Sequence, residues 1–148
     1  MPSLFFSFIV PVFNRPQEIR ELLHSLVKLH FEDAFEVVVV EDGSKESSES
    51  VVREFDQTLN ISYFFKDNSG PGDSRNFGMR NAKGNYFIVL DSDCILPSDY
   101  LRQVKKELTT AYVDCFGGPD AADASFTRLQ KAINYSMTSF LTTGGIRG

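Results

Sequence analysis

Two aspartates separated by one serine, in the triplet Asp91-Ser92-Asp93, are the residues of this sequence that most directly suggest chemistry. They follow Phe87 to Leu90, an apolar run without a polar face, which predicts a central strand of a parallel sheet covered on both faces. Two carboxylates so close together repel each other unless a positive charge lies between them. The spacing therefore predicts a divalent cation at the carboxyl end of this strand. The alternative is that Asp93 or Ser98 caps a helix beginning near Pro97.

Polar and glycine-containing segments also follow the three apolar runs that come earlier in the chain. Because the carboxyl ends of parallel strands lie along one edge of a sheet, these segments are predicted to converge there. We therefore expect one shared binding site, with coincidence as the alternative, since every strand needs a turn. The segments are Pro11-Val12-Phe13-Asn14, Glu41-Asp42-Gly43-Ser44 and Asp67 to Gly72.

Three side chains in these segments are suited to binding a nucleotide. Asp42 can accept hydrogen bonds from a base or from ribose hydroxyls, and Phe13 offers a face for stacking. Arg75 follows closely enough to reach a base edge or a phosphate oxygen. Each has a simpler alternative: Asp42 could cap a turn, Phe13 could belong to the core, and Arg75 could be a surface cation.

The elements that must position these residues alternate between strand and helix patterns. Apolar runs predict strands, apolar residues at helical spacing predict helices, and Gly84 is expected to cap the third helix. Four such rounds predict an α/β fold with a mostly parallel sheet and helices on both faces. The predicted strands span residues 4–10, 35–40, 61–65 and 87–90, with a further strand possible at 111–116 and a helix at 125–141.

Composition excludes several classes of protein. The 148 residues carry a net charge of −5 and no basic run, which argues against a nucleic-acid surface. No apolar stretch is long enough to span a bilayer, and the apolar start lacks the features of a signal peptide. Cys94 and Cys115 are expected to be reduced core residues of a cytoplasmic chain, with a disulfide between them as the alternative.

The strand-end segments resemble, in order and spacing, those of family 2 glycosyltransferases with the GT-A fold, a three-layer Rossmann-like arrangement for nucleotide-diphospho-sugars. The resemblance covers nearly the whole chain, including Gly70 to Gly78, although Glu41-Asp42 stands where the family commonly has two aspartates. It implies an inverting hexosyl transfer from a UDP- or GDP-sugar, assisted by Mn²⁺ or Mg²⁺, to a saccharide or lipid-linked acceptor, in cell-surface polysaccharide synthesis. It also implies that Asp93 and Asp91 bind the metal and that the donor is bound by Pro11, Val12, Phe13, Asn14, Glu41, Asp42, Arg75, Asp91 and Ser92.

The family's carboxylate base, which deprotonates the acceptor hydroxyl, has no match after Asp93. We therefore expect a C-terminally truncated chain, with the base beyond Gly148. Residues 1–118 would form the donor-binding core, and residues 119–148 the incomplete start of the acceptor region.

Two other classes remain as alternatives. A non-catalytic nucleotide-sugar binding module would differ from a truncated enzyme only in the residues that the gene encodes after Gly148. A signalling receiver domain also gathers aspartates at strand ends, but it needs an acidic pair after the first strand, where this chain has Pro11 to Asn14.

Overall fold

The computed structural model describes residues 3–117 of the chain. Strands and helices alternate four times, as the apolar pattern predicts. The strands are β1 (Phe6–Val12), β2 (Phe35–Asp42), β3 (Ile61–Lys66) and β4 (Tyr86–Val89). The helices are α1 (Pro16–Val27), α2 (Glu49–Arg53), α3 (Pro71–Asn81) and α4 (Tyr100–Thr110).

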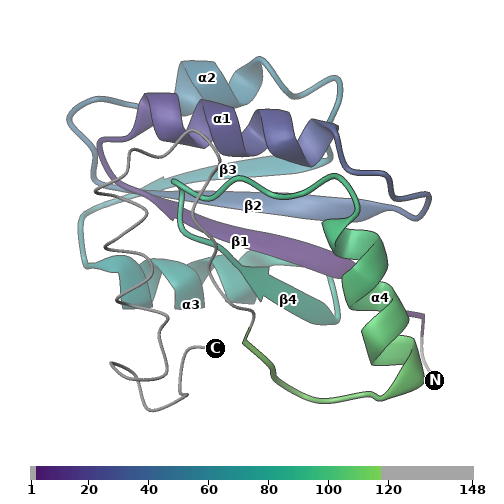
Figure 1. Cartoon of the computed structure of the whole chain (residues 1–148). Helices are drawn as coiled ribbons and strands as arrows, with labels where there is room; N and C mark the ends of the chain where they lie inside the picture. The colour runs from purple at the N-terminus through teal and green to yellow at the C-terminus, as the bar shows by residue number, and fades with distance from the viewer. Residues whose placement is uncertain (1–2, 118–148) are drawn as a thin grey trace, which may run out of the picture. The chain divides into compact units, whose positions relative to one another are not determined.

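The four strands form one parallel sheet in the order β3-β2-β1-β4. Helices α1 and α2 lie over one face of the sheet and α3 over the other, so the predicted three-layer α/β arrangement is confirmed (Figure 1). The chain first builds outward from β1 to β3 and then returns to add β4 on the other side of β1. Open α/β sheets bind ligands outside the carboxyl ends of their strands at such a reversal of strand order.

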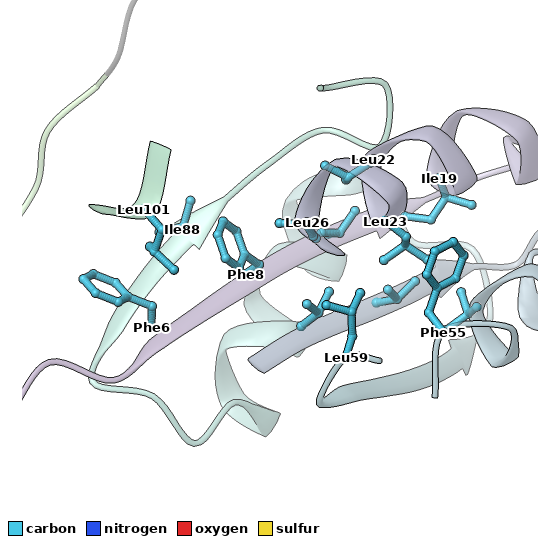
Figure 2. Close-up of a cluster of buried hydrophobic side chains, with 14 of the residues drawn as sticks. Phe6, Phe8, Ile19, Leu22, Leu23, Leu26, Phe55, Leu59, Ile88 and Leu101 are labelled. Atoms are coloured by element: carbon cyan, nitrogen blue, oxygen red, sulfur yellow. The ribbon is translucent and has the colours of Figure 1, made fainter. Parts of the chain in front are cut away.

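The main core lies between the sheet and the helices α1, α2 and α4. Phe8 and Val10 of β1 pack there with Leu22 and Leu26 of α1, and all four are buried. Figure 2 shows Phe8, Leu22 and Leu26 within this cluster. Burying apolar surface at roughly 25 cal/mol per Å² is the main source of stability for such a layer. A smaller cluster around Ile9, Val38 and Val40 lies on the opposite face, against Phe77 of α3.

Strand β4 differs from the expectation that it is central and covered on both faces. Within the described residues it lies at the edge of the sheet, next to β1 alone. Tyr86 and Ile88 are buried, whereas Phe87 and Val89 are exposed. The strand therefore alternates between a core face and an open face, and its uninterrupted apolar sequence was a misleading sign of double coverage.

Pro11 does not stop the first strand, contrary to the predicted end at residue 10, because β1 continues to Val12 and Pro11 pairs with Val40 of β2. Two residues earlier, Ile9 accepts a hydrogen bond from the N–H of Leu90, and the paired strand β4 has already ended at Val89. Residues two apart in a strand face the same neighbour, so Pro11 faces the side that β4 has left. Its missing N–H therefore costs the sheet no hydrogen bond.

Gly84 is not the predicted helix cap. Helix α3 ends at Asn81 with an extended residue, Ala82, after it. A Cβ atom on Gly84 would lie 2.2 Å from the hydroxyl oxygen of Ser7 and 2.5 Å from the carbonyl oxygen of Phe5. Glycine is required here because the loop before β4 passes directly against the start of β1.

The end of the described chain also departs from expectation. Residues 111–116 form no strand, and Cys115 is exposed, whereas Cys94 is partly buried; neither cysteine forms a disulfide. By its internal contacts the chain divides into a unit of Met1–Ala111 and a second unit that begins at Tyr112. The domain boundary expected at residue 118 and the helix expected at 125–141 lie outside the described residues. Among the helices in residues 3–117, none has the length and apolar character needed to cross a bilayer.

Candidate functional site

A cavity of about 510 Å³ opens at the carboxyl ends of the strands. This volume is in the range of small-molecule binding sites. All four strand-end segments contribute to its lining, as the sequence predicts. The lining residues are Pro11, Val12, Phe13, Arg15, Asp42, Asn68, Gly70, Pro71, Arg75, Asp91, Ser92 and Asp93.

Asp42 occupies the last position of β2 and is held by hydrogen bonds from the segment after β3. Its Oδ1 accepts from the ammonium group of Lys66 and from the backbone N–H of Ser69 at 2.9 Å. Its Oδ2 accepts from the N–H of Gly70, also at 2.9 Å. The carbonyl of Asp42 accepts from Nδ2 of Asn68 at 2.8 Å. The carboxylate is therefore fixed in one orientation at the cavity wall, with unused acceptor capacity on Oδ2.

These contacts also set the charge of Asp42. Burial by itself would raise the pKa of the carboxyl group, but the hydrogen bonds from Lys66, Ser69 and Gly70 outweigh it and lower the pKa below its ordinary value of 3.8. Asp42 is thus an anion at neutral pH, and it presents an acceptor to the cavity.

Each carboxylate of the Asp91-Ser92-Asp93 triplet is paired with an arginine from a different part of the chain. Nη1 of Arg15, in the β1–α1 connection, lies 2.6 Å from Oδ2 of Asp93. Nη2 of Arg75, in α3, lies 2.7 Å from Oδ1 of Asp91. Both aspartates are exposed, and among residues 3–117 each arginine pairs with one oxygen of its aspartate, which leaves the other oxygen available to a further ligand. Ser92, between them, is buried.

The two paired aspartates also fit a divalent cation. Mg²⁺ binds oxygen ligands and is commonly held by one or two carboxylates together with substrate phosphates. Asp91 and Asp93 supply two such carboxylates at the cavity mouth. In residues 3–117 no set of three or more histidine, cysteine or acidic side chains surrounds a common point.

Phe13 lies at the cavity with 48% of its surface exposed, so it does not belong to the core. The side chain of its neighbour Val12, by contrast, is buried in the main core. Phe13 follows the last residue of β1 and is exposed at the cavity, where its ring is available for stacking.

Asn14 is not among the residues that line the cavity. Its φ is +52°, in the left-handed region that asparagine tolerates better than most residues. Its Oδ1 accepts from the N–H groups of Lys45 and Glu46, and its own N–H donates to Oγ of Ser44. Asn14 therefore ties the loop after β1 to the loop after β2, and it positions Phe13 and Arg15 on either side of it.

The structure also places Glu41 away from the cavity. Its carboxylate is fully buried and accepts from the N–H of Ser48 at 2.9 and 3.0 Å, from Ser47 Oγ and from the hydroxyl of Tyr63. Burial, together with the bond to Glu41, raises the pKa of Tyr63 to about 12. Successive residues of β2 point to opposite faces of the sheet, so Glu41 lies on the other face from Asp42, which takes the cavity side. There the bonds from Ser47 and Ser48 attach the start of α2 to the sheet.

Two residues at the site went unrecognised in the sequence. Lys66 lies directly opposite Asp42 in the sheet register, and Arg15 follows the motif residue Asn14. Their proximity to the site was readable from the sequence. Their partners were not, because these depend on strand register and on a contact between residues 78 positions apart.

Comparison with known proteins places this geometry in context. The model of the family described as "Glycosyl transferase family 2" matches residues 7–147. The poly(ribitol-phosphate) beta-N-acetylglucosaminyltransferase TarS of Staphylococcus aureus is 36% identical over 112 residues, which cover 74% of this chain and 19% of TarS. The chain thus spans about a fifth of the length of that relative.

Solved structures agree with the sequence matches. The crystal structure of S. aureus TarS 1–349 in complex with UDP-GlcNAc superposes with a TM-score of 0.71 and 32% identity, over 79% of this chain and 37% of that chain. The mannosyltransferase PcManGT from Pyrobaculum calidifontis, in complex with GDP-Man and Mn²⁺, superposes with a TM-score of 0.65 and 28% identity. That match covers 70% of this chain and 32% of the mannosyltransferase.

Proposed function

The chain belongs to glycosyl transferase family 2, and from this premise we propose that its cavity binds the nucleoside diphosphate of a sugar donor. The observation that carries the proposal is the meeting of all four strand-end segments at one cavity with three aspartates and two arginines. The likeness to TarS and PcManGT, whose structures hold UDP-GlcNAc and GDP-Man, supports a UDP- or GDP-sugar as the donor.

Phe13 and Asp42 would bind the nucleoside. The exposed ring of Phe13 stacks on the base, and Oδ2 of Asp42 accepts a hydrogen bond from the base or ribose. Lys66 and the N–H groups of Ser69 and Gly70 keep Asp42 charged and oriented for this contact. Pro11 and Val12 supply the adjoining wall.

Asp91 and Asp93 would hold Mn²⁺ or Mg²⁺ between themselves and the diphosphate. When bound, such a cation neutralises the negative charge that develops on the leaving diphosphate. Such a cation would add the positive charge that the phosphates need, because the two arginines of the lining are already paired with Asp93 and Asp91. Arg75 stays beside Asp91 and orients it, and the start of α3 presents its positive helix end to the same cavity.

The finer parts of the proposal concern the whole protein. We propose that the sugar is transferred with inversion to a saccharide or lipid-linked hydroxyl, in cell-surface polysaccharide synthesis at the cytoplasmic side of the membrane. The base that removes the acceptor proton would come from beyond the described residues. A non-catalytic nucleotide-sugar binding module is the second candidate, since the three carboxylates at the cavity are all assigned to the donor.

Calorimetry with UDP and GDP, with and without Mn²⁺, tests the proposal. We expect binding of at least one nucleotide that is strengthened by Mn²⁺, and loss of the Mn²⁺ effect in Asp93→Asn. Asp33→Asn is a matched control, because Asp33 and Asp93 are both 52% exposed and each is paired with one basic side chain. Absence of nucleotide binding would refute the donor site, and an unchanged Mn²⁺ effect in Asp93→Asn would refute the metal assignment.

A further inference from the structure

Arg15 has no role yet in the proposed reaction, although it lines the cavity and pairs with the aspartate assigned to the metal. Its guanidinium and the Asp93 carboxylate lie 2.6 Å apart, and the two side chains are 48% and 52% exposed. A cation that binds Asp93 through this oxygen must displace Arg15. The guanidinium must then find another anion in the same cavity or return to water.

The backbone of Arg15 is fixed, whereas its side chain is free to move. Asn14, directly before it, is tied to the loop after β2 by three hydrogen bonds. The carbonyl of Arg15 itself accepts from the N–H of Ile19 at 3.1 Å and so begins α1. The half-exposed guanidinium therefore extends from a rigid base and can exchange partners within the cavity without any movement of the chain.

We propose that Arg15 is an exchangeable counter-ion that neutralises Asp93 in the free protein and passes to the diphosphate oxygens when a divalent cation takes the Asp93 carboxylate. This role rests on the proposed donor site. It makes Arg15 a diphosphate-binding residue and also a competitor of the cation, so that cation and donor each favour the binding of the other.

The energies permit such an exchange. Exposed ion pairs contribute about 0.2–1 kcal/mol, which a divalent cation can readily outweigh. The planar guanidinium group matches the geometry of phosphate oxygens, to which it can donate two parallel hydrogen bonds. Arg75 is less suited to the exchange, because its side chain is more buried and its Nε is shielded from solvent.

The first test is binding of Mn²⁺ alone, monitored by the electron paramagnetic resonance signal of the free ion. Removing the competitor in Arg15→Gln should tighten Mn²⁺ binding by about 1.5- to 5-fold, the equivalent of an exposed ion pair. Arg20, on α1, pairs with Glu54, and neither residue lines the cavity, so Arg20→Gln removes the same charge and should leave the affinity for Mn²⁺ unchanged. In an Asp93→Asn background, Arg15→Gln should no longer change the affinity for Mn²⁺.

The second test is calorimetry of UDP and UMP without metal. Arg15→Gln should weaken the binding of UDP several-fold and the binding of UMP less, whereas Arg15→Lys should keep part of the preference for UDP over UMP. If wild-type protein binds Mn²⁺ and UDP but Arg15→Gln behaves like Arg20→Gln in both tests, the proposed role of Arg15 is wrong and the donor site still stands. Wild-type protein that binds neither would overturn the donor site itself, and this role with it.

Discussion

Lys66 lies directly across the sheet from Asp42, and its ammonium group donates a hydrogen bond to the Asp42 carboxylate. The two side chains are only 12% and 5% exposed. Lys66 also donates to the carbonyl of Asp67 and to Oγ of Ser69. The pair therefore joins the ends of β2 and β3 to the loop that forms one wall of the cavity.

Replacing Lys66 with methionine should destabilise the protein by about 3 kcal/mol, because removing one partner leaves a buried carboxylate without its counter-charge. Urea unfolding at neutral pH measures the change. Lys105→Met is the control, since Lys105 pairs with Asp33 on the surface, with side chains 43% and 52% exposed, and should cost at most about 1 kcal/mol. Equal effects of the two substitutions would contradict the structural role of the buried pair.

Acid should weaken the fold partly through Asp42. Its folded-state pKa lies below the ordinary value of 3.8, so its contribution to stability is complete above that value and is lost as the pH falls through the lowered folded-state pKa. Asp42→Asn should therefore be less stable than wild type at pH 7, with the difference shrinking below about pH 4. Urea unfolding at a series of pH values measures it. A difference that stays constant down to about pH 2.5 would contradict the assignment.

Phe13→Ala should weaken UDP binding by about 5- to 150-fold, because stacking of a base on an aromatic ring contributes about 1–3 kcal/mol. Binding of pyrophosphate, which has no base, should be unaffected. Phe65→Ala is a suitable control, since Phe65 is exposed on β3 and does not line the cavity. Calorimetry with both ligands measures the change, and an equal loss of affinity for UDP and pyrophosphate in Phe13→Ala would count against stacking.

Glu41→Gln tests whether this residue binds the donor or only supports the fold. The buried carboxylate accepts from Ser48, Ser47 and Tyr63, and an amide cannot accept all of these bonds. We expect a loss of about 1–3 kcal/mol in stability. Since Glu41 does not line the cavity, UDP affinity should be close to that of wild type, and a large loss of affinity in a folded variant would restore its assignment to the donor site.

Two glycines of α3 should respond in opposite ways to alanine. A Cβ atom on Gly78 would lie 2.6 Å from Cγ2 of the buried Ile9, so Gly78→Ala should destabilise by about 1–3 kcal/mol. A Cβ atom on Gly72 would meet nothing within 4 Å, and alanine is the better helix former by about 1 kcal/mol, so Gly72→Ala should be neutral or stabilising. Thermal unfolding of both variants compares them directly.

The sequence predicted the layers of this fold and the gathering of its strand-end loops, because both follow from local apolar spacing and from the parallel direction of the strands. It did not predict that β4 lies at the sheet edge or that β1 continues through Pro11. Both depend on the order of the strands and on where a neighbouring strand ends. The same limit applies to Lys66 and Arg15, whose partners are fixed by register and by long-range contact.

The tie made by Asn14 has a consequence for engineering this protein. The side chain and backbone of Asn14 hydrogen-bond to residues 44–46 of the neighbouring loop, 30 to 32 residues further along the chain. The positions of Phe13 and Arg15 therefore depend on that loop. If only the loop after β1 were replaced by that of a relative to change the donor preference, its hydrogen bonds to residues 44–46 would be lost. A working chimera would have to carry residues 13–15 and 44–46 together.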